Sequence, residues 1–410
     1  MSMSSSPDAV RQVGPQAAPR FGRAMLEHWA LDPAITYLNH GTVGAPPRRA
    51  LVAQQAIRDE IERQPSRFLL RELSYVRASE KVQGAPRLRT AAEQVATFLG
   101  ARGDDLVFVD NATTAVNAVL RSVDLRRGDE ILILDHAYGA VRNAADFIAR
   151  ERGARVRVVE LPYPVTDPAA VVEAVVQGIR SRTRLALVDH ITSESALVLP
   201  LAEIAARCRA RGVAVLVDGA HAPGAIPLEL PALGVDWYAG NLHKWAWSPR
   251  SSAILWADPA RQPQLHPTVI SWGLGLGYAH EFDWVGTRDP SAHLAAPAGI
   301  VFMQELGVQA VQRYNHDLAW NAGRTLSQSW GTTLSCPESM VGTMLTAALP
   351  ERAGSTREHA TALRDALLFE DHIEVQVHAW RGRLRARLSA QIYNESADVE
   401  RLAAAVSKRL

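Results

Sequence analysis

The sequence predicts an α/β protein with a mostly parallel seven-stranded sheet, followed by a smaller α+β domain at the C-terminus. Helical and strand-like segments alternate between residues 88 and 256, and the strand-like segments are apolar and rich in β-branched residues. Repeated units of this kind are typical of a parallel sheet covered on both faces. The alternation stops near residue 290, where longer helical stretches begin.

The elements of the first region follow one another at short intervals. Apolar residues at helical spacing predict helices at Leu88–Leu99, Ala115–Ser122, Tyr138–Arg152, Ala169–Arg180 and Leu201–Arg211. Short apolar runs predict strands at Leu106–Asp110, Glu130–Asp135, Arg155–Leu161, Arg184–Ile191, Ala214–Asp218, Trp237–Gly240 and Ala253–Trp256.

The last 120 residues have a different pattern. After the long helices come the alternating stretches Ile373–His378 and Arg383–Tyr393, and then a terminal helix. We expect a large domain over residues 24–289, of which residues 24–45 pack with the small domain, and a small domain over residues 290–410. Residues 1–23 are rich in Ser, Pro and Arg without an apolar core, which predicts a mobile tail rather than a secretory signal.

Composition excludes several classes of function. Among 410 residues, 44 are basic and 43 acidic, so the basic excess of a nucleic-acid or anionic-membrane binder is missing. The two cysteines cannot build a disulfide scaffold or a closed cysteine metal site. No apolar run approaches the roughly 18 residues of a membrane span. We therefore expect a cytoplasmic protein that binds neither nucleic acid nor membrane.

Lysine is rare in this chain. Only Lys81, Lys244 and Lys408 are lysine among the 44 basic residues, and the others are arginine. Arginine stays protonated and cannot form a Schiff base, whereas a partly buried lysine can lose its proton and attack a carbonyl. Lys244 is the one lysine in an apolar, aromatic setting, which makes it the candidate for such chemistry.

Polar residues follow the predicted strands where the strands end. Ligands of open α/β sheets bind beyond these carboxyl ends. The segments are Asn111-Ala112-Thr113-Thr114, Asp135-His136-Ala137-Tyr138, His190-Ile191-Thr192-Ser193, Asp218-Gly219-Ala220-His221 and Asn241-Leu242-His243-Lys244. Taken singly, most of them are explained by ordinary helix caps and turns.

Together these segments indicate one kind of cofactor. Small and hydroxylated residues at a helix N-terminus form an anion site. An anion site, a carboxylate, an imidazole and a rare lysine at one sheet edge fit pyridoxal phosphate (PLP). The glycine pattern G-x-G-x-x-G of dinucleotide-binding enzymes does not follow the first strand, which weakens that alternative.

The ordered set of motifs resembles the class V aminotransferase superfamily of fold-type I PLP enzymes. Within it, Tyr37-Leu38-Asn39-His40-Gly41-Thr42-Val43-Gly44 and the segment from Arg387 to Glu395 resemble the isopenicillin N epimerase-like group. The resemblance covers about nine-tenths of the chain, from Thr36 to the C-terminus. It implies a PLP-dependent transferase fold.

The resemblance also implies roles for particular residues. Lys244 would form the internal aldimine and act as general base and acid at Cα, with Asp218 on the pyridine nitrogen and His221 near the aldimine. His136 would stack on the ring, and Ser193 would contact the phenolic oxygen. The phosphate would be held by Ala112, Thr113, Asn241 and His243.

The remaining implied residues concern the substrate and a second subunit. Arg387 would clamp the carboxylate of a small amino-acid-type substrate, and Asn39 and His40 would border the same pocket. The resemblance implies a homodimer with shared active sites, in which Thr287 reaches the partner's phosphate. Many members of the superfamily have Ser or Thr where this chain has Asn241.

Several reactions at Cα stay open. The resemblance favours an epimerase or racemase acting through an external aldimine and a quinonoid, with a C–S β-lyase as the alternative and an aminotransferase after that. Inversion needs a second proton donor opposite Lys244, which the sequence does not assign. Neither Cys208 nor Cys336 fits the position of the nucleophile of cysteine desulfurases.

Two other classes of function agree less well with the sequence. A non-catalytic regulator would need a fused DNA-binding domain or a damaged site, and the sequence shows neither. A metal-dependent hydrolase would need metal-ligand spacing such as H-E-x-x-H, which is missing. Arg67 and Arg71 fit a solvated helix face better than a second carboxylate site.

Overall fold

The computed structural model describes residues 21–77 and 81–410. Most of the predicted tail therefore lies outside the described residues. Its last residues are ordered, because Gly22 donates a backbone hydrogen bond of 2.7 Å to Ile392 O and a 3-10 helix begins at Arg23.

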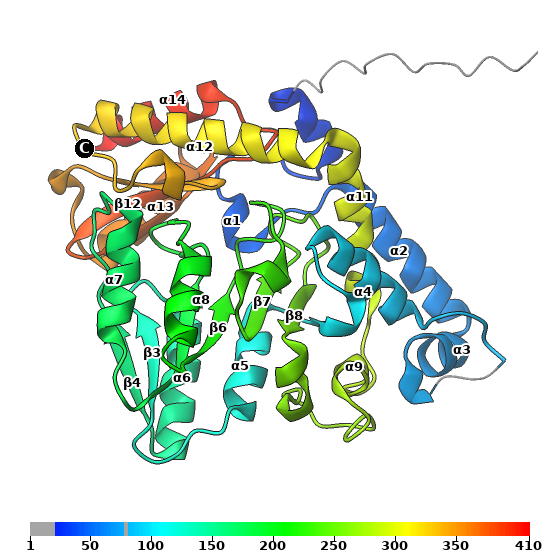
Figure 1. The fold of residues 1–410 in the computed structure, drawn as a ribbon. Helices are drawn as coiled ribbons and strands as arrows, with labels where there is room; N and C mark the ends of the chain where they lie inside the picture. The colour runs from blue at the N-terminus through cyan, green and yellow to red at the C-terminus, as the bar shows by residue number, and fades with distance from the viewer. Residues whose placement is uncertain (1–20, 78–80) are drawn as a thin grey trace, which may run out of the picture.

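A seven-stranded sheet forms the centre of the molecule (Figure 1). Its strands are β2 (Leu106–Val109), β3 (Glu130–Leu134), β4 (Arg155–Val159), β5 (Thr183–Asp189), β6 (Ala214–Asp218), β7 (Trp237–Asn241) and β8 (Ala253–Ala257). Their order is β2-β8-β7-β6-β5-β3-β4. Only β8 runs antiparallel to its neighbours, so the predicted mostly parallel sheet is confirmed.

Helices cover both faces of this sheet because successive strand residues point to opposite sides. In β3, Ile131 and Ile133 pack against the core beneath α5 and α6, whereas Leu132 and Leu134 pack against the core beneath α4, α7 and α8. These helices are α4 (Arg87–Phe98), α5 (Ala112–Ser122), α6 (Gly139–Arg152), α7 (Pro168–Gly178) and α8 (Leu201–Arg209).

Two element boundaries differ from the prediction for a visible reason. Helix α5 begins at Ala112, three residues earlier than expected, because the Asn111 side chain accepts a hydrogen bond from Thr114 N and caps it. Strand β4 ends at Val159 rather than Leu161, because Leu161 N donates to the Asp135 carboxylate instead of to a strand.

The C-terminal part forms a second, smaller core. Its antiparallel sheet contains β9 (Met344–Ala348), β11 (Gln376–Trp380) and β12 (Arg383–Ser389) in the order β11-β12-β9. Helices α12 (Val308–Trp330), α13 (Arg357–Phe369) and α14 (Ser396–Arg409) pack against this sheet or one another, and Figure 1 shows α12 and α14 side by side.

The N-terminal segment joins the two parts. Strand β1 (Thr36–Tyr37) pairs in parallel with β10 (Ile373–Glu374). The predicted strand Ile373–His378 is therefore split into β10 and the start of β11, with Val375 between them. The remaining helices are α1 (His40–Val43), α2 (Arg48–Arg63), α3 (Pro65–Arg67), α9 (Tyr278–Asp283), α10 (Ser291–Leu294) and α11 (Ala296–Leu306).

Within the described chain, no single helix is long and apolar enough to cross a membrane. One bent pair of helices, Ser291–Leu306 and Val308–Trp330, which meet at 81°, has the length and apolar composition of a membrane span, by these two criteria only.

Candidate active site

A cavity of about 860 Å³ lies at the carboxyl edge of the central sheet and extends to the small β-sheet. Residues that follow β2, β5, β6 and β7 converge on it because parallel strands present their carboxyl ends at one edge. The predicted site residues that line it are Ala112, Thr113, Ser193, Asp218, His221, Asn241, His243, Lys244 and Arg387.

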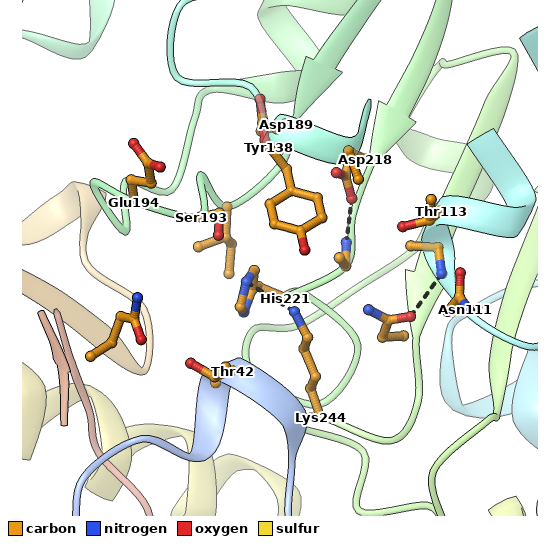
Figure 2. A pocket seen from close by; sticks show the side chains of 18 of the residues that line it. Thr42, Asn111, Thr113, Tyr138, Asp189, Ser193, Glu194, Asp218, His221 and Lys244 are labelled. Carbon is orange, nitrogen blue, oxygen red and sulfur yellow. Dashed lines mark hydrogen bonds between the residues drawn. The ribbon is translucent and has the colours of Figure 1, made fainter. Parts of the chain in front are cut away.

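Lys244 projects into this cavity from the turn after β7 (Figure 2). Its Nζ lies 3.1 Å from Nε2 of His221. Burial of the amine, followed by the charge of Arg387, lowers the pKa of Lys244 to about 7. Burial and the charge of Lys244 hold the pKa of His221 well below its usual range. A neutral imidazole can therefore accept a hydrogen bond from the lysine.

Asp218 ends β6 beneath the cavity. Its Oδ1 accepts a hydrogen bond of 3.0 Å from Ala220 N. Burial raises the pKa of this carboxyl group. Gly219 is required beside it, because a Cβ there would lie 2.2 Å from the ring of Tyr238. A buried carboxylate facing a cavity fits a cationic group of a ligand.

Asp189 is the strand neighbour of Asp218 and also lines the cavity. Burial and the charge of Asp218 raise the pKa of Asp189 well above its usual range. The predicted strand Arg184–Ile191 placed Asp189 inside the strand, whereas β5 ends at Asp189, so its position repeats that of Asp218 at the end of β6.

The start of α5 presents backbone donors to the same cavity. Asn241 Oδ1 accepts a hydrogen bond of 2.8 Å from Ala112 N, and Asn111 Oδ1 accepts one of 2.9 Å from Thr114 N. The amide of Thr113, between them, belongs to the first turn, whose N–H groups have no partner within the helix. This arrangement suits a phosphate.

Arg387 enters from β12 on the opposite side. Its Nη1 donates to Ser193 O at 2.7 Å and its Nη2 to Thr42 Oγ1 at 2.7 Å. No carboxylate among the described residues forms an ion pair with this buried guanidinium, and burial lowers the pKa of Arg387 to about 10. A buried cation held by neutral acceptors fits a carboxylate supplied by a ligand.

His136 lies close to the cavity wall in sequence but packs on other side chains. It is not among the lining residues: its Nδ1 lies 2.6 Å from Ser195 Oγ, and its ring packs edge-on against Trp380 with centroids 4.6 Å apart. Tyr138, two residues later, lines the cavity, and 48% of its surface is exposed. The stacking of His136 on the cofactor stays a prediction.

Asn39 and His40 lie behind the cavity rather than in its lining. His40 contacts Lys244 O at 2.9 Å and the hydroxyl of Tyr393 at 2.9 Å. The Asn39 side chain donates to Glu374. Their neighbours Gly41 and Thr42 are the residues of this segment that line the cavity.

Thr287 is also outside the cavity. It lines a separate small hollow with Arg288 and Pro290. Its predicted role concerns a second subunit and stays a prediction. Arg67 bonds to Glu72, and Arg71 donates to Ser66 O, so neither faces the cavity.

The structure adds lining residues that sequence reasoning missed. Besides Tyr138 and Asp189, they include Thr42, Asn143, Glu194, Arg357, Gln376 and His378. Arg357 comes from α13, whereas Gln376 and His378 come from β11, in which Gln376 pairs with Arg387 across the small sheet.

Neither cysteine lines the cavity. Burial raises the pKa of Cys336 and of Cys208 to about 11, which keeps both thiols protonated at neutral pH. In the part of the chain that the structure describes, no group of three His, Cys, Asp or Glu side chains could hold a metal ion.

Comparisons with known proteins agree with this geometry. A family model described as "Aminotransferase class-V" matches residues 74–402. Isopenicillin N epimerase of Streptomyces clavuligerus is 34% identical, over 92% of this chain and 95% of the epimerase. The probable chloroplastic L-cysteine desulfhydrase of Arabidopsis thaliana is 33% identical, over 92% of this chain and 83% of that protein.

Solved structures show the same fold. A mutant of C-DES with glycine covalently linked to its PLP cofactor matches with a TM-score of 0.72 and 21% identity, over 91% of this chain and 96% of that chain. The cysteine desulfurase of Thermococcus onnurineus matches with a TM-score of 0.76 and 17% identity, over 96% of this chain and 99% of that chain.

Proposed function

The chain belongs to the class V aminotransferase family and uses pyridoxal phosphate as its cofactor, and on this basis we propose that it is an epimerase or racemase that acts at Cα of an amino acid. The observation that carries the proposal is the half-buried Lys244, whose amine shares one cavity with the carboxylate of Asp218 and the guanidinium of Arg387.

The cavity offers a matching group for each part of the cofactor. Lys244 would bind its aldehyde carbon, and Asp218 would face its pyridine nitrogen. The Thr113 amide and His243 would hold its phosphate. Asn241 would fix the Ala112 turn, because its Oδ1 is already bonded to Ala112 N. Bound there, pyridoxal phosphate withdraws electrons from Cα of an attached amino acid and makes the Cα proton acidic.

The residues of the chain supply binding and proton transfer. Arg387 would hold the substrate carboxylate with the N–H groups that now bond Ser193 and Thr42. That anchor lies in the same cavity as the Lys244 amine. A lysine whose pKa is about 7 is half deprotonated at neutral pH and can both accept and return the Cα proton.

A C–S β-lyase is the second candidate, because the relatives include proteins named L-cysteine desulfhydrase at 33% identity. Both reactions begin with removal of the Cα proton by Lys244. They differ in whether the proton returns to Cα or a β-substituent leaves. Transamination ranks third, since no described feature favours it over these two.

Proton NMR in D₂O tests the proposal with the PLP-loaded protein. The substrates are alanine, α-aminoadipate, S-methylcysteine and isopenicillin N. Loss of the Cα proton signal with a change of optical rotation is the expected result. Pyruvate together with loss of the β-substituent would make the protein a lyase. Intact Cα protons across all four substrates would contradict both candidates.

A further inference from the structure

Inversion at Cα requires proton transfer on two sides of that carbon, and Lys244 serves one of them. This inference rests on the proposed function, and it concerns the group that faces Lys244. Tyr138 is the N-cap residue of α6, directly after the turn that follows β3. Its ring stands in the cavity with 48% of the residue exposed, and its hydroxyl has no hydrogen-bond partner among the described residues.

Tyr138 and Lys244 enter the cavity from opposite sides. In Figure 2 the tyrosine comes from the edge that carries Asp189, with its hydroxyl directed toward the region of His221 and Lys244. The lysine rises from the other edge with its amine directed toward the tyrosine. They come from different strand ends, β3 and β7, so neither depends on the other for its position.

Arg387 would hold the substrate carboxylate in the same cavity that Tyr138 and Lys244 line. Its charge contributes to the lowered pKa of Lys244. An amino acid held by its carboxylate at Arg387 would have its Cα between the amine and the phenol.

We propose that Tyr138 is the second proton donor and acceptor, acting on the side of Cα opposite to Lys244. In one direction the Cα–H bond breaks and the proton passes to the Lys244 amine. The Tyr138 O–H bond then breaks and a new Cα–H bond forms on the other side. The phenolate regains its proton from water, which reaches this exposed side chain, and the lysine releases its proton there. The reverse direction exchanges the two roles, with no net oxidation.

Three other titratable groups in the lining, His221, His243 and Glu194, fit this role less well. His221 lies 3.1 Å from Lys244 Nζ and so is on the lysine's side. His243 uses its Nδ1 in a contact of 3.1 Å with Ser252 O. Glu194 lines the cavity beyond Ser193, away from the lysine in Figure 2, and is the competitor that experiment must exclude.

The Tyr138→Phe variant tests the proposal because it removes the hydroxyl and keeps the ring. Tyr163→Phe is the matched control, since Tyr163 packs against His136 and Trp380 outside the cavity. Each PLP-loaded protein is incubated in D₂O with the L and D forms of alanine, α-aminoadipate and S-methylcysteine. Cα-proton exchange is followed by NMR and inversion by chiral chromatography, while cofactor absorbance and PLP affinity are recorded separately.

The expected result for Tyr138→Phe is a one-sided loss. One enantiomer exchanges its Cα proton nearly as fast as with the wild-type protein, because Lys244 still serves it. Exchange of the other enantiomer and inversion both fall by about 100-fold or more, the usual effect of losing a general acid or base. Cofactor absorbance and affinity stay as in the wild type, and Tyr163→Phe behaves like the wild type throughout.

Three results would overturn the proposal. Unchanged inversion in Tyr138→Phe would show that the hydroxyl is not used. Equal slowing of Cα-proton exchange for both enantiomers would show that the Tyr138 hydroxyl has a packing role only. A one-sided loss in Glu194→Gln instead would assign the role to Glu194. By contrast, if the wild-type protein exchanges the Cα proton of neither enantiomer, the proposed function itself is contradicted. This inference then fails with it.

Discussion

At the residue scale, Lys244 shows how position changes the chemistry of a side chain. An exposed lysine stays protonated up to about pH 10.4. Here burial, with the charge of Arg387 added, lowers the pKa of Lys244 to about 7, while His221 offers a neutral partner for the amine. Only the neutral amine can attack the aldehyde of the cofactor.

We predict that attachment of pyridoxal phosphate to the apoprotein follows this pKa. The rate should rise about tenfold per pH unit below pH 7 and level off above it, because the neutral fraction of Lys244 does so. Absorbance stopped-flow across pH 5 to 10 measures it. In Arg387→Gln the midpoint should move up, because a cation near the amine is removed. A wild-type midpoint near pH 10 would contradict the assigned environment.

At the element scale, the start of α5 is held by side chains from two directions. Asn111 caps the helix at Thr114 N, and Asn241 from β7 fixes Ala112 N. The helix therefore presents the Thr113 amide in a defined direction. The side-chain oxygen of Asn241 therefore stabilises the turn that begins α5.

Replacing Asn241 by Ala should weaken cofactor binding. Loss of the 2.8 Å hydrogen bond leaves Ala112 N buried without a partner, which costs about 1–2 kcal/mol. The dissociation constant of pyridoxal phosphate should rise about tenfold. Asn117→Ala is the control, since Asn117 bonds to Thr113 O within the same helix and does not line the cavity. Equal effects of the two substitutions would indicate general loosening of α5.

The sequence predicted the positions of helices and strands better than the directions in which side chains point. Asp218 was found because apolar strand patterns show where strands end, and Lys244 because it is the one lysine in an apolar, aromatic setting. That Tyr138 and not His136 lines the cavity depends on the path of the turn after β3, where Ala137 N bonds to Leu134 O. Gln376 and His378 depend on the register of β11 against β12, which is a long-range property.

At the scale of the whole molecule, one surface segment is unusually apolar. Between β8 and α9, the large apolar side chains Val269, Ile270, Trp272, Leu274 and Leu276 are each more than half exposed. Contiguous exposed apolar groups often mark a protein interface. This segment supports the proposal that the protein forms a homodimer.

We therefore predict a dimer of twice 44.7 kDa in solution, held in part by this segment. The double substitution Leu274→Glu and Leu276→Glu should shift the protein toward monomer, because charges would have to be desolvated at the contact. Light scattering after gel filtration measures both masses. Phe369→Glu is the control, since Phe369 is 74% exposed at the end of α13. A monomeric wild-type protein at micromolar concentration would contradict the prediction.

The most direct test of the whole account asks which lysine carries the cofactor. The PLP-loaded protein is reduced with borohydride, digested and mapped by mass spectrometry. The chain has only Lys81, Lys244 and Lys408 as possible attachment sites. We predict that the reduced pyridoxyl group is found on Lys244 alone and is lost in Lys244→Ala. A pyridoxyl group on Lys81 or Lys408, or on no lysine of the PLP-loaded protein, would contradict the account.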